Sequence, residues 1–269
     1  MEYLLRSINV LLPILYLSSL VVYGFYFFKP DTGTRKVARG LLHLSVVMHL
    51  IFLLLITFAY LRPPMSNLME AMSVVAFAVA AVYGVLEFRQ KETSLGVFVL
   101  TFVFVFQALS SGFVTHQAIS SGEVSNNRAV VIHVGTALVS YSALAISALF
   151  SAMYLLQYHN IKKRHFGLIY ERFPSLNQLN QLGYHGALAG FVLLTFSILS
   201  GMAWAFINID EFNKQLPKVI VVMLAWVIYG GLTSLRLFWN WQGPRLAYFS
   251  LVGFAITLIS LWVAFHGVD

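Results

Sequence analysis

Hydrophobic residues run through this chain in stretches of about twenty, and short polar links separate the stretches. A stretch of that length crosses a hydrocarbon layer of about 30 Å as an α-helix. The links contain proline, glycine and serine residues, which end helices. The pattern predicts about eight transmembrane helices, over Ile8–Phe28, Leu41–Tyr60, Ser66–Leu86, Leu95–Val114, Val130–Gln157, Gly183–Ile207, Lys218–Phe238 and Leu246–His266.

Composition supports this interpretation. Hydrophobic residues make up 59% of the 269 residues and charged residues 10%, whereas roughly a quarter of the residues in a soluble domain are charged. The first stretch is too long for the core of a signal peptide, so we expect a retained helix. No link is long enough for a separate soluble domain. We therefore predict an all-α, polytopic membrane protein with a single transmembrane domain over residues 1–269.

Basic residues indicate the orientation. Most of the 17 lysines and arginines lie in alternate links, and cytoplasmic links carry the excess of positive charge. Both termini are therefore predicted to be extracytoplasmic, in a multi-pass protein of the inner (plasma) membrane. The net charge of +7 is spread over short links rather than one folded face. It indicates contact with membrane lipid and no nucleic-acid partner.

Cysteine is absent from the chain. The chain therefore has no disulfide, no thiolate metal site and no thiol for covalent attachment of haem. Any thiol chemistry must belong to a partner.

Two histidines are predicted near the extracytoplasmic ends of different helices. His133 lies near the start of the fifth stretch and His266 at the end of the eighth, so both side chains can reach one level. A pair of neutral imidazoles at one depth can hold haem iron without a covalent bond. The alternative is that both are interfacial residues bonded to water or headgroups.

Three further histidines are predicted at or below the middle of the membrane. His43 and His49 are separated by about 240° around one helix, so they cannot both bind the same face of one iron. His185 enters the sixth stretch at nearly the depth of His43, which makes a second metal-binding pair conceivable. Hydrogen bonding between helices is the alternative.

Other polar and aromatic residues are candidates for the same extracytoplasmic site. Trp204 precedes a polar link that contains Asp210, and an aromatic side chain there can pack against a planar macrocycle or belong to the interfacial aromatic belt. Arg128 and Lys218 can pair with haem propionates, or orient the chain. Glu70, about one turn inside its stretch, requires a polar partner.

The segment from His49 through Arg62 to Ser66–Met72 resembles the CcsA-type (ResC-type) cytochrome c assembly proteins. The resemblance continues through His133-Val134 and through Gly201-Met202-Ala203-Trp204-Ala205, which is similar to the entry to the tryptophan-rich WWD loop of that family. It covers residues 41–269. Further matching segments are Ser140–Leu144, Leu155–Gln157, Phe173–Leu176, Gly190–Thr195, Leu224–Tyr229 and Trp241–Arg245.

The resemblance implies a haem-handling protein of cytochrome c biogenesis. It implies non-covalent haem b, with His133 as the first external ligand, His49 as the first internal ligand, and Trp204 and Asp210 as remnants of the WWD loop. Gly231 occupies the position of the second internal histidine of the family, and the chain ends before the second external one. His266 and His185 are candidates only from geometry.

The implied partners are a membrane subunit of a cytochrome c synthase and apocytochrome c. We expect no enzymatic activity from this chain alone, although it suits a subunit of a haem lyase. The resemblance extends equally to short HemX-like and YpjD-like relatives, so a regulatory or scaffolding protein without haem chemistry is an alternative. A small-solute transporter that uses Glu70 and the intramembrane histidines as a proton relay is another.

Overall fold

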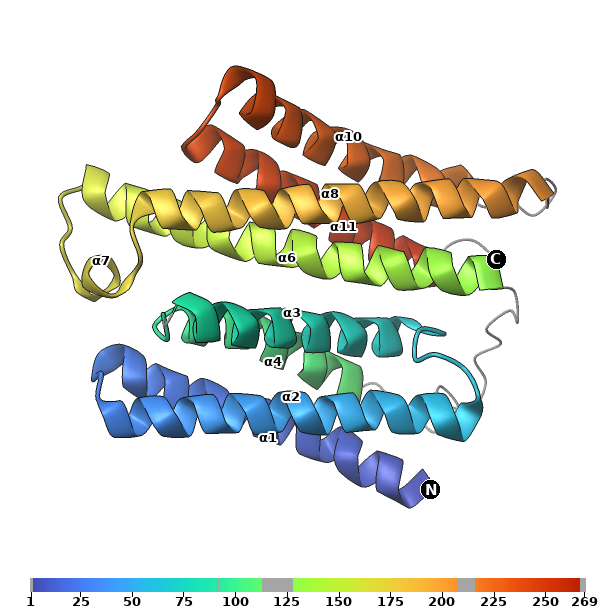
Figure 1. Ribbon diagram of the computed structural model, residues 1–269, viewed down its shortest axis with the longest axis horizontal. Coiled ribbons are helices and arrows are strands. Elements are labelled where there is room, and N and C mark those ends of the chain that lie inside the picture. Colours follow the sequence, from blue (N-terminus) through green and yellow to red (C-terminus); the bar gives the residue numbers. More distant parts are fainter. Residues whose placement is uncertain (1, 91, 113–127, 208–215, 267–269) are drawn as a thin grey trace. The chain divides into compact units, whose positions relative to one another are not determined.

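A computed structural model describes residues 2–90, 92–112, 128–207 and 216–266 of the chain (Figure 1). The chain forms two compact units, residues 1–124 and residues 125–269. Each unit is described by itself, so the single transmembrane domain expected from the sequence stays a prediction.

Unit 1 is a group of four helices in which α1 packs against α2 and α4, and α3 packs against α2 and α4. Asp31 is the N-cap of α2, since its carboxylate accepts a hydrogen bond of 2.8 Å from the Thr34 amide. The α2 helix ends where Leu61 adopts a left-handed conformation, before two prolines. The four helices are α1 (Glu2–Phe28), α2 (Thr32–Tyr60), α3 (Leu68–Gln90) and α4 (Gly96–Gly112).

Unit 2 is built around two long helices, α6 and α8, that pack along much of their length. The helices α10 and α11 form a second pair, and α11 also packs against α6. The short α7 lies in the link between α6 and α8. The described helices are α6 (Arg128–Lys162), α7 (Leu168–Arg172), α8 (Leu176–Ile207), α10 (Leu216–Trp239) and α11 (Pro244–His266).

Seven of the described helices are long and apolar enough to cross a membrane, and α4 is a shorter apolar helix. The predicted all-α, polytopic fold is confirmed. Many helix faces carry exposed leucine, valine and phenylalanine side chains, as expected for surfaces that face lipid tails rather than water.

Candidate functional site

His133, in the second turn of α6, bonds to the facing helix α8. Its Nδ1 lies 2.7 Å from the carbonyl oxygen of Ser197, and the Ser197 hydroxyl donates to the His133 carbonyl over 3.0 Å. Ser197 is buried, and its carbonyl also accepts a hydrogen bond from the Ser200 hydroxyl. The imidazole is therefore anchored between two helices on its Nδ1 side.

This anchor determines which nitrogen of His133 carries the proton. A carbonyl oxygen can only accept, so Nδ1 is the protonated nitrogen and Nε2 keeps its lone pair. Among the residues that the structure describes, none forms a hydrogen bond with Nε2. Histidines that bind metals have this arrangement, in which one nitrogen donates to a carbonyl and the other is available to the metal.

Gly201, one turn beyond Ser197, has no side chain, and the His133 ring occupies the space beside it. A Cβ atom added at Gly201 would lie 2.8 Å from both Cε1 and Nδ1 of His133. Even an alanine there would push against the ring. Gly201 belongs to the segment that resembles the family, and the contact gives it a physical role.

Three more glycines on α8 set the register of this helix pair. An added Cβ atom would lie 3.3 Å from Ser151 Oγ at Gly183 and 2.9 Å from the Ser147 amide nitrogen at Gly186, and at Gly190 it would overlap the Leu144 side chain. The partners move back along α6 as the glycines advance along α8, so the two helices are antiparallel and closely packed. This register brings Gly201 and Ser197 to His133.

The end of α11 lies near the level of His133 along α6. Tyr141 of α6 bonds to Ser260 of α11, and Ser147 bonds to Ser250, so these helices are also antiparallel. Residue 266 is about 9 Å beyond Ser260, and His133 is about 12 Å beyond Tyr141 in the same direction. The backbone therefore permits His133 and His266 to serve one site.

Several predicted residues of this site lie beyond what is described. His266 and Trp204 are described only as helix positions, without their side chains, and the same is true of Arg128. Asp210 lies outside the described residues. Lys218 is described, and its Nζ donates to the Ala264 carbonyl over 3.2 Å, in the last turn of α11 and close in sequence to residue 266.

His49 has a different environment, in the middle of unit 1. It is fully buried, and both ring nitrogens have partners: the Tyr16 hydroxyl lies 3.0 Å from Nδ1, and the Ser73 hydroxyl lies 2.9 Å from Nε2. Ser73 donates its only proton to Gln107 Oε1 over 3.0 Å. Nε2 must therefore donate to Ser73, and Nδ1 accepts from Tyr16.

The chain of hydrogen bonds continues until it returns to α1. Gln107 donates to Ser111 over 3.0 Å, and Ser111 donates to Asn9 Oδ1 over 3.1 Å. Because Tyr16 and Asn9 both belong to α1, the chain visits all four helices and closes on the first. We call it the His49 network, and its members are Tyr16, His49, Ser73, Gln107, Ser111 and Asn9.

The remaining intramembrane histidines are both exposed. His43 donates from Nδ1 to the Arg39 carbonyl of its own helix over 2.6 Å, and its exposure beside the fully buried His49 agrees with their predicted separation around α2. His185 belongs to unit 2, so its predicted pairing with a histidine of unit 1 stays a prediction.

Glu70 has the polar partner that the sequence required. Both of its carboxylate oxygens accept from the Arg62 guanidinium, at 2.8 and 2.9 Å, and the Ser66 amide also donates to it. The hydrogen bonds to Glu70 raise the pKa of Arg62, which keeps this cation charged. The pair joins the link after α2 to the first turn of α3.

A second buried acid was missed. The predicted span ended at Leu86, but α3 continues, and Glu87 is only 2% exposed. Its carboxylate accepts from Tyr23 of α1 and from Arg39 of α2, at 2.5 and 3.1 Å. Arg39, the eighth residue of α2, was the available signal, since a buried carboxylate needs such a partner.

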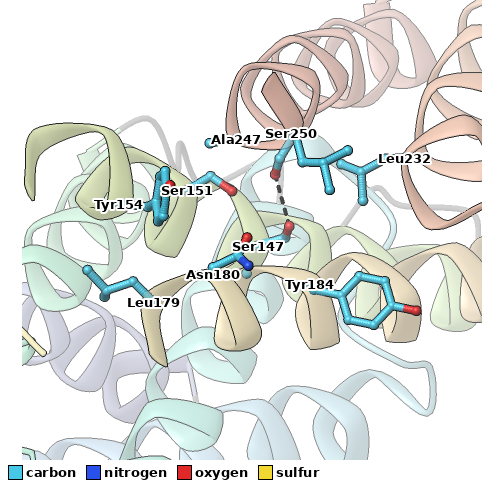
Figure 2. A pocket seen from close by; sticks show the side chains of 11 residues that line it. Ser147, Ser151, Tyr154, Leu179, Asn180, Tyr184, Leu232, Ala247 and Ser250 are labelled. Atoms are coloured by element: carbon cyan, nitrogen blue, oxygen red, sulfur yellow. Dashed lines mark hydrogen bonds between the residues drawn. The ribbon is translucent and has the colours of Figure 1, made fainter. Parts of the chain in front are cut away.

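Unit 2 also contains a small cavity where α6, α8, α10 and α11 meet (Figure 2). Its free space is about 20 Å³, enough for about one water molecule. The Ser147–Ser250 hydrogen bond of 2.9 Å crosses its wall. The other polar side chains that line it are those of Ser151, Tyr154, Asn180 and Tyr184.

Within the described part of the chain, no group of three or more histidine, aspartate or glutamate side chains could hold a metal ion. A bis-histidine haem site needs only two protein ligands.

The fold and the site together define a multi-pass α-helical membrane protein. In it, His133 bonds through Nδ1 to a neighbouring helix and keeps Nε2 available. The family model described as Cytochrome C assembly protein matches residues 65–267. The chain therefore belongs to the cytochrome c assembly protein family, and this membership supports a role in cytochrome c biogenesis.

Proteins named HemX and CcsA are among the similar curated proteins. Protein HemX of Bacillus subtilis (strain 168) is 25% identical over 252 residues, which cover 93% of this chain and 91% of that protein. Cytochrome c biogenesis protein CcsA of Heterosigma akashiwo (strain NIES-293 / 8280G21-1) is 27% identical over 240 residues, covering 77% of this chain and 73% of that protein. No solved structure gives a significant match.

Proposed function

We propose that this protein binds haem b non-covalently and presents it for attachment to apocytochrome c, with His133 as an axial ligand. One observation carries the proposal: His133 donates from Nδ1 to the Ser197 carbonyl, which leaves the Nε2 lone pair for iron. When bound, haem would supply an iron that takes imidazole nitrogens as ligands and two propionates that pair with cations. The residues of this chain orient the imidazole and fix its tautomer.

His266 is the proposed second axial ligand. The antiparallel packing of α6 and α11 supports it, because both positions lie toward the same end of the helix pair. Lys218, beside the last turn of α11, is a proposed partner for a propionate. Trp204 and Asp210 remain proposed contacts of the macrocycle from the resemblance.

His49 is proposed as a residue on the route of haem across the membrane, also from the resemblance. In that role one of its two nitrogens must first give up its bond to Tyr16 or Ser73. His185 remains a proposed metal ligand, and its side chain is exposed in the third turn of α8.

The proposed partners follow from the chemistry that the chain lacks. Since it has no cysteine, the thiols that receive haem belong to apocytochrome c, and a membrane subunit of a cytochrome c synthase supplies the domain that faces them. The proposed location is the inner (plasma) membrane.

A second candidate is a regulatory or scaffolding protein without haem chemistry. The similarity to protein HemX along nearly the full length of both chains favours it.

The test is the visible absorption spectrum and pyridine haemochrome assay of the purified protein, made with ample haem. We expect a Soret band and about one haem per chain in the wild type. His133→Ala should lose the haem, and His266→Ala should lose it or change the spectrum. The matched control is His43→Ala, which changes an exposed histidine and should keep the haem. A colourless wild type would overturn the proposal and favour the second candidate.

A further inference from the structure

Unit 1 contains a cavity between the Arg62–Glu70 ion pair and the His49 network. Its free space is about 20 Å³, enough for about one water molecule. Phe52, Leu53, Ile56 and Pro64 form its apolar walls. Its polar lining consists of Asn9, Glu70, Ser73 and Ser110.

The polar groups that line the cavity do not satisfy one another's hydrogen-bonding capacity. Asn9 is 7% exposed, its Oδ1 accepts from Ser111, and its Nδ2 donates to none of the described residues. The Ser110 hydroxyl gives its proton to the Met69 carbonyl, and Ser73 gives its proton to Gln107. The cavity therefore presents one amide donor and several oxygen acceptors.

The backbone of α1 adds another acceptor at the same residue. Pro13 lies inside α1 and has no amide hydrogen, so the Asn9 carbonyl lacks its usual helical donor. In a membrane helix, such a freed carbonyl is satisfied by a neighbouring side chain or by ordered water.

We propose that this cavity is a water-binding site that connects the Arg62–Glu70 ion pair to His49. A water molecule there accepts from Asn9 Nδ2 and donates to the Glu70 carboxylate and to a serine hydroxyl. Ser73 lines the cavity and accepts from His49 Nε2, so this water lies one hydrogen bond from the partner of His49. The His49 proton thereby gains a route of exchange with the solvent at the Arg62 end of unit 1.

The direct test is X-ray footprinting of the wild-type protein in nanodiscs, in which hydroxyl radicals formed from bound water label adjacent side chains. Phe52, a cavity wall that is 4% exposed, should be labelled severalfold more than Phe150, a core residue of unit 2 that is 2% exposed. Equal labelling of the two phenylalanines would overturn the proposal, because the cavity would be dry.

The second test follows exchange of the His49 Nε2 proton into D₂O, by NMR of protein labelled with ¹⁵N-histidine. Asn9→Leu removes the donor and fills the space, and Ser110→Val fills the space while it keeps Asn9. Each should slow exchange at least about tenfold, since the proton must then wait for a rarer opening of the bundle.

The matched control is Ser19→Ala, which changes a buried serine of α1 that bonds to Ser45 and does not line the cavity. Its exchange rate should equal that of the wild type. Unchanged rates in both cavity variants, or equal slowing in the control, would contradict the proposed route. Neither test involves haem, so both outcomes are independent of the function proposed above.

Discussion

In unit 1 the four helices are joined by buried polar side chains, whereas in unit 2 α6 and α8 approach through glycines. The two histidines at these contacts differ accordingly. His49 is fully buried with both nitrogens bonded, and His133 is half-buried with one nitrogen bonded to a backbone carbonyl. The second nitrogen therefore decides what an intramembrane histidine can do. A polar network uses both nitrogens for cohesion, and a glycine-lined contact holds the ring while one nitrogen stays available.

The largest effect is expected from Gly186→Leu in unit 2. Its Cβ would lie 2.9 Å from the Ser147 amide nitrogen and 3.0 Å from the Ala143 carbonyl oxygen, and backbone atoms cannot move aside easily. We expect a loss of about 3 kcal/mol in the free energy of unfolding, measured by denaturation in mixed micelles. Gly231→Leu is the control, since nothing lies within 4 Å of an added Cβ there. Equal stability of the two variants would show that close glycine packing does not hold unit 2 together.

The next effect is expected from His49→Ala in unit 1. It leaves the Tyr16 and Ser73 hydroxyls without their partner in a buried site, which should cost about 2 kcal/mol. The measurement is the same denaturation curve, with His43→Ala as the control because that side chain is exposed and bonds only to its own helix. A His49 variant as stable as the control would show that the hydrogen bonds of His49 do not stabilise unit 1.

Gly201→Ala tests whether α8 sets the position of the His133 ring in unit 2. The added methyl group would press on the His133 ring at 2.8 Å, so the ring must turn and its bond to Ser197 must lengthen. With haem bound at His133 as proposed, we expect its affinity to fall by about tenfold, equivalent to about 1.4 kcal/mol, with a shifted Soret band and little change in stability. Haem titration followed by absorbance measures it. An unchanged titration would mean that the position of the ring is not set by α8.

The smallest effect is expected at Asp31, which belongs neither to the His49 network nor to the glycine contact between α6 and α8. Hydrogen bonds from Thr34 lower the pKa of the Asp31 carboxyl, so its contribution is present above the unfolded pKa and is lost as the pH falls through the lowered value. Asp31→Ala should lower the melting temperature slightly at neutral pH, and the difference should shrink below about pH 4. Asp31→Asn keeps a capping oxygen but not the charge, so at neutral pH its melting temperature should lie between those of the wild type and Asp31→Ala and should not follow this pH dependence. A difference independent of pH would exclude the charge as its cause.

The helices could be predicted because their signal is local. Apolar runs of sufficient length decide that a segment is helical and membrane-spanning, whatever it packs against. The burial of Glu87 could not be read in the same way, since it depends on Tyr23 and Arg39 from two other helices. A charged residue at the end of an apolar run is taken for the end of the membrane span when its partners are distant in sequence.

In the candidate site, too, local features could be predicted and contacts between distant segments could not. The residue type and predicted depth of His133 made it a candidate, and the resemblance strengthened that expectation. The roles of Ser197 and Gly201 depend on the register of α6 against α8, which arises from contacts between residues more than thirty positions apart. Serine and glycine are also too common in membrane helices to indicate a partner by themselves.

The two acids of α3 have a consequence for the bilayer itself. Glu70 and Glu87 lie about 25 Å apart along the helix axis, and each is paired with an arginine from α2 or from the link that follows it. The pairs therefore bracket an apolar band slightly thinner than an average hydrocarbon layer of about 30 Å. Since both ends are tied to the same neighbour, this helix pair cannot adapt by sliding. A bilayer of lipids with long acyl chains must become thinner around this pair, so unit 1 should prefer thin membranes.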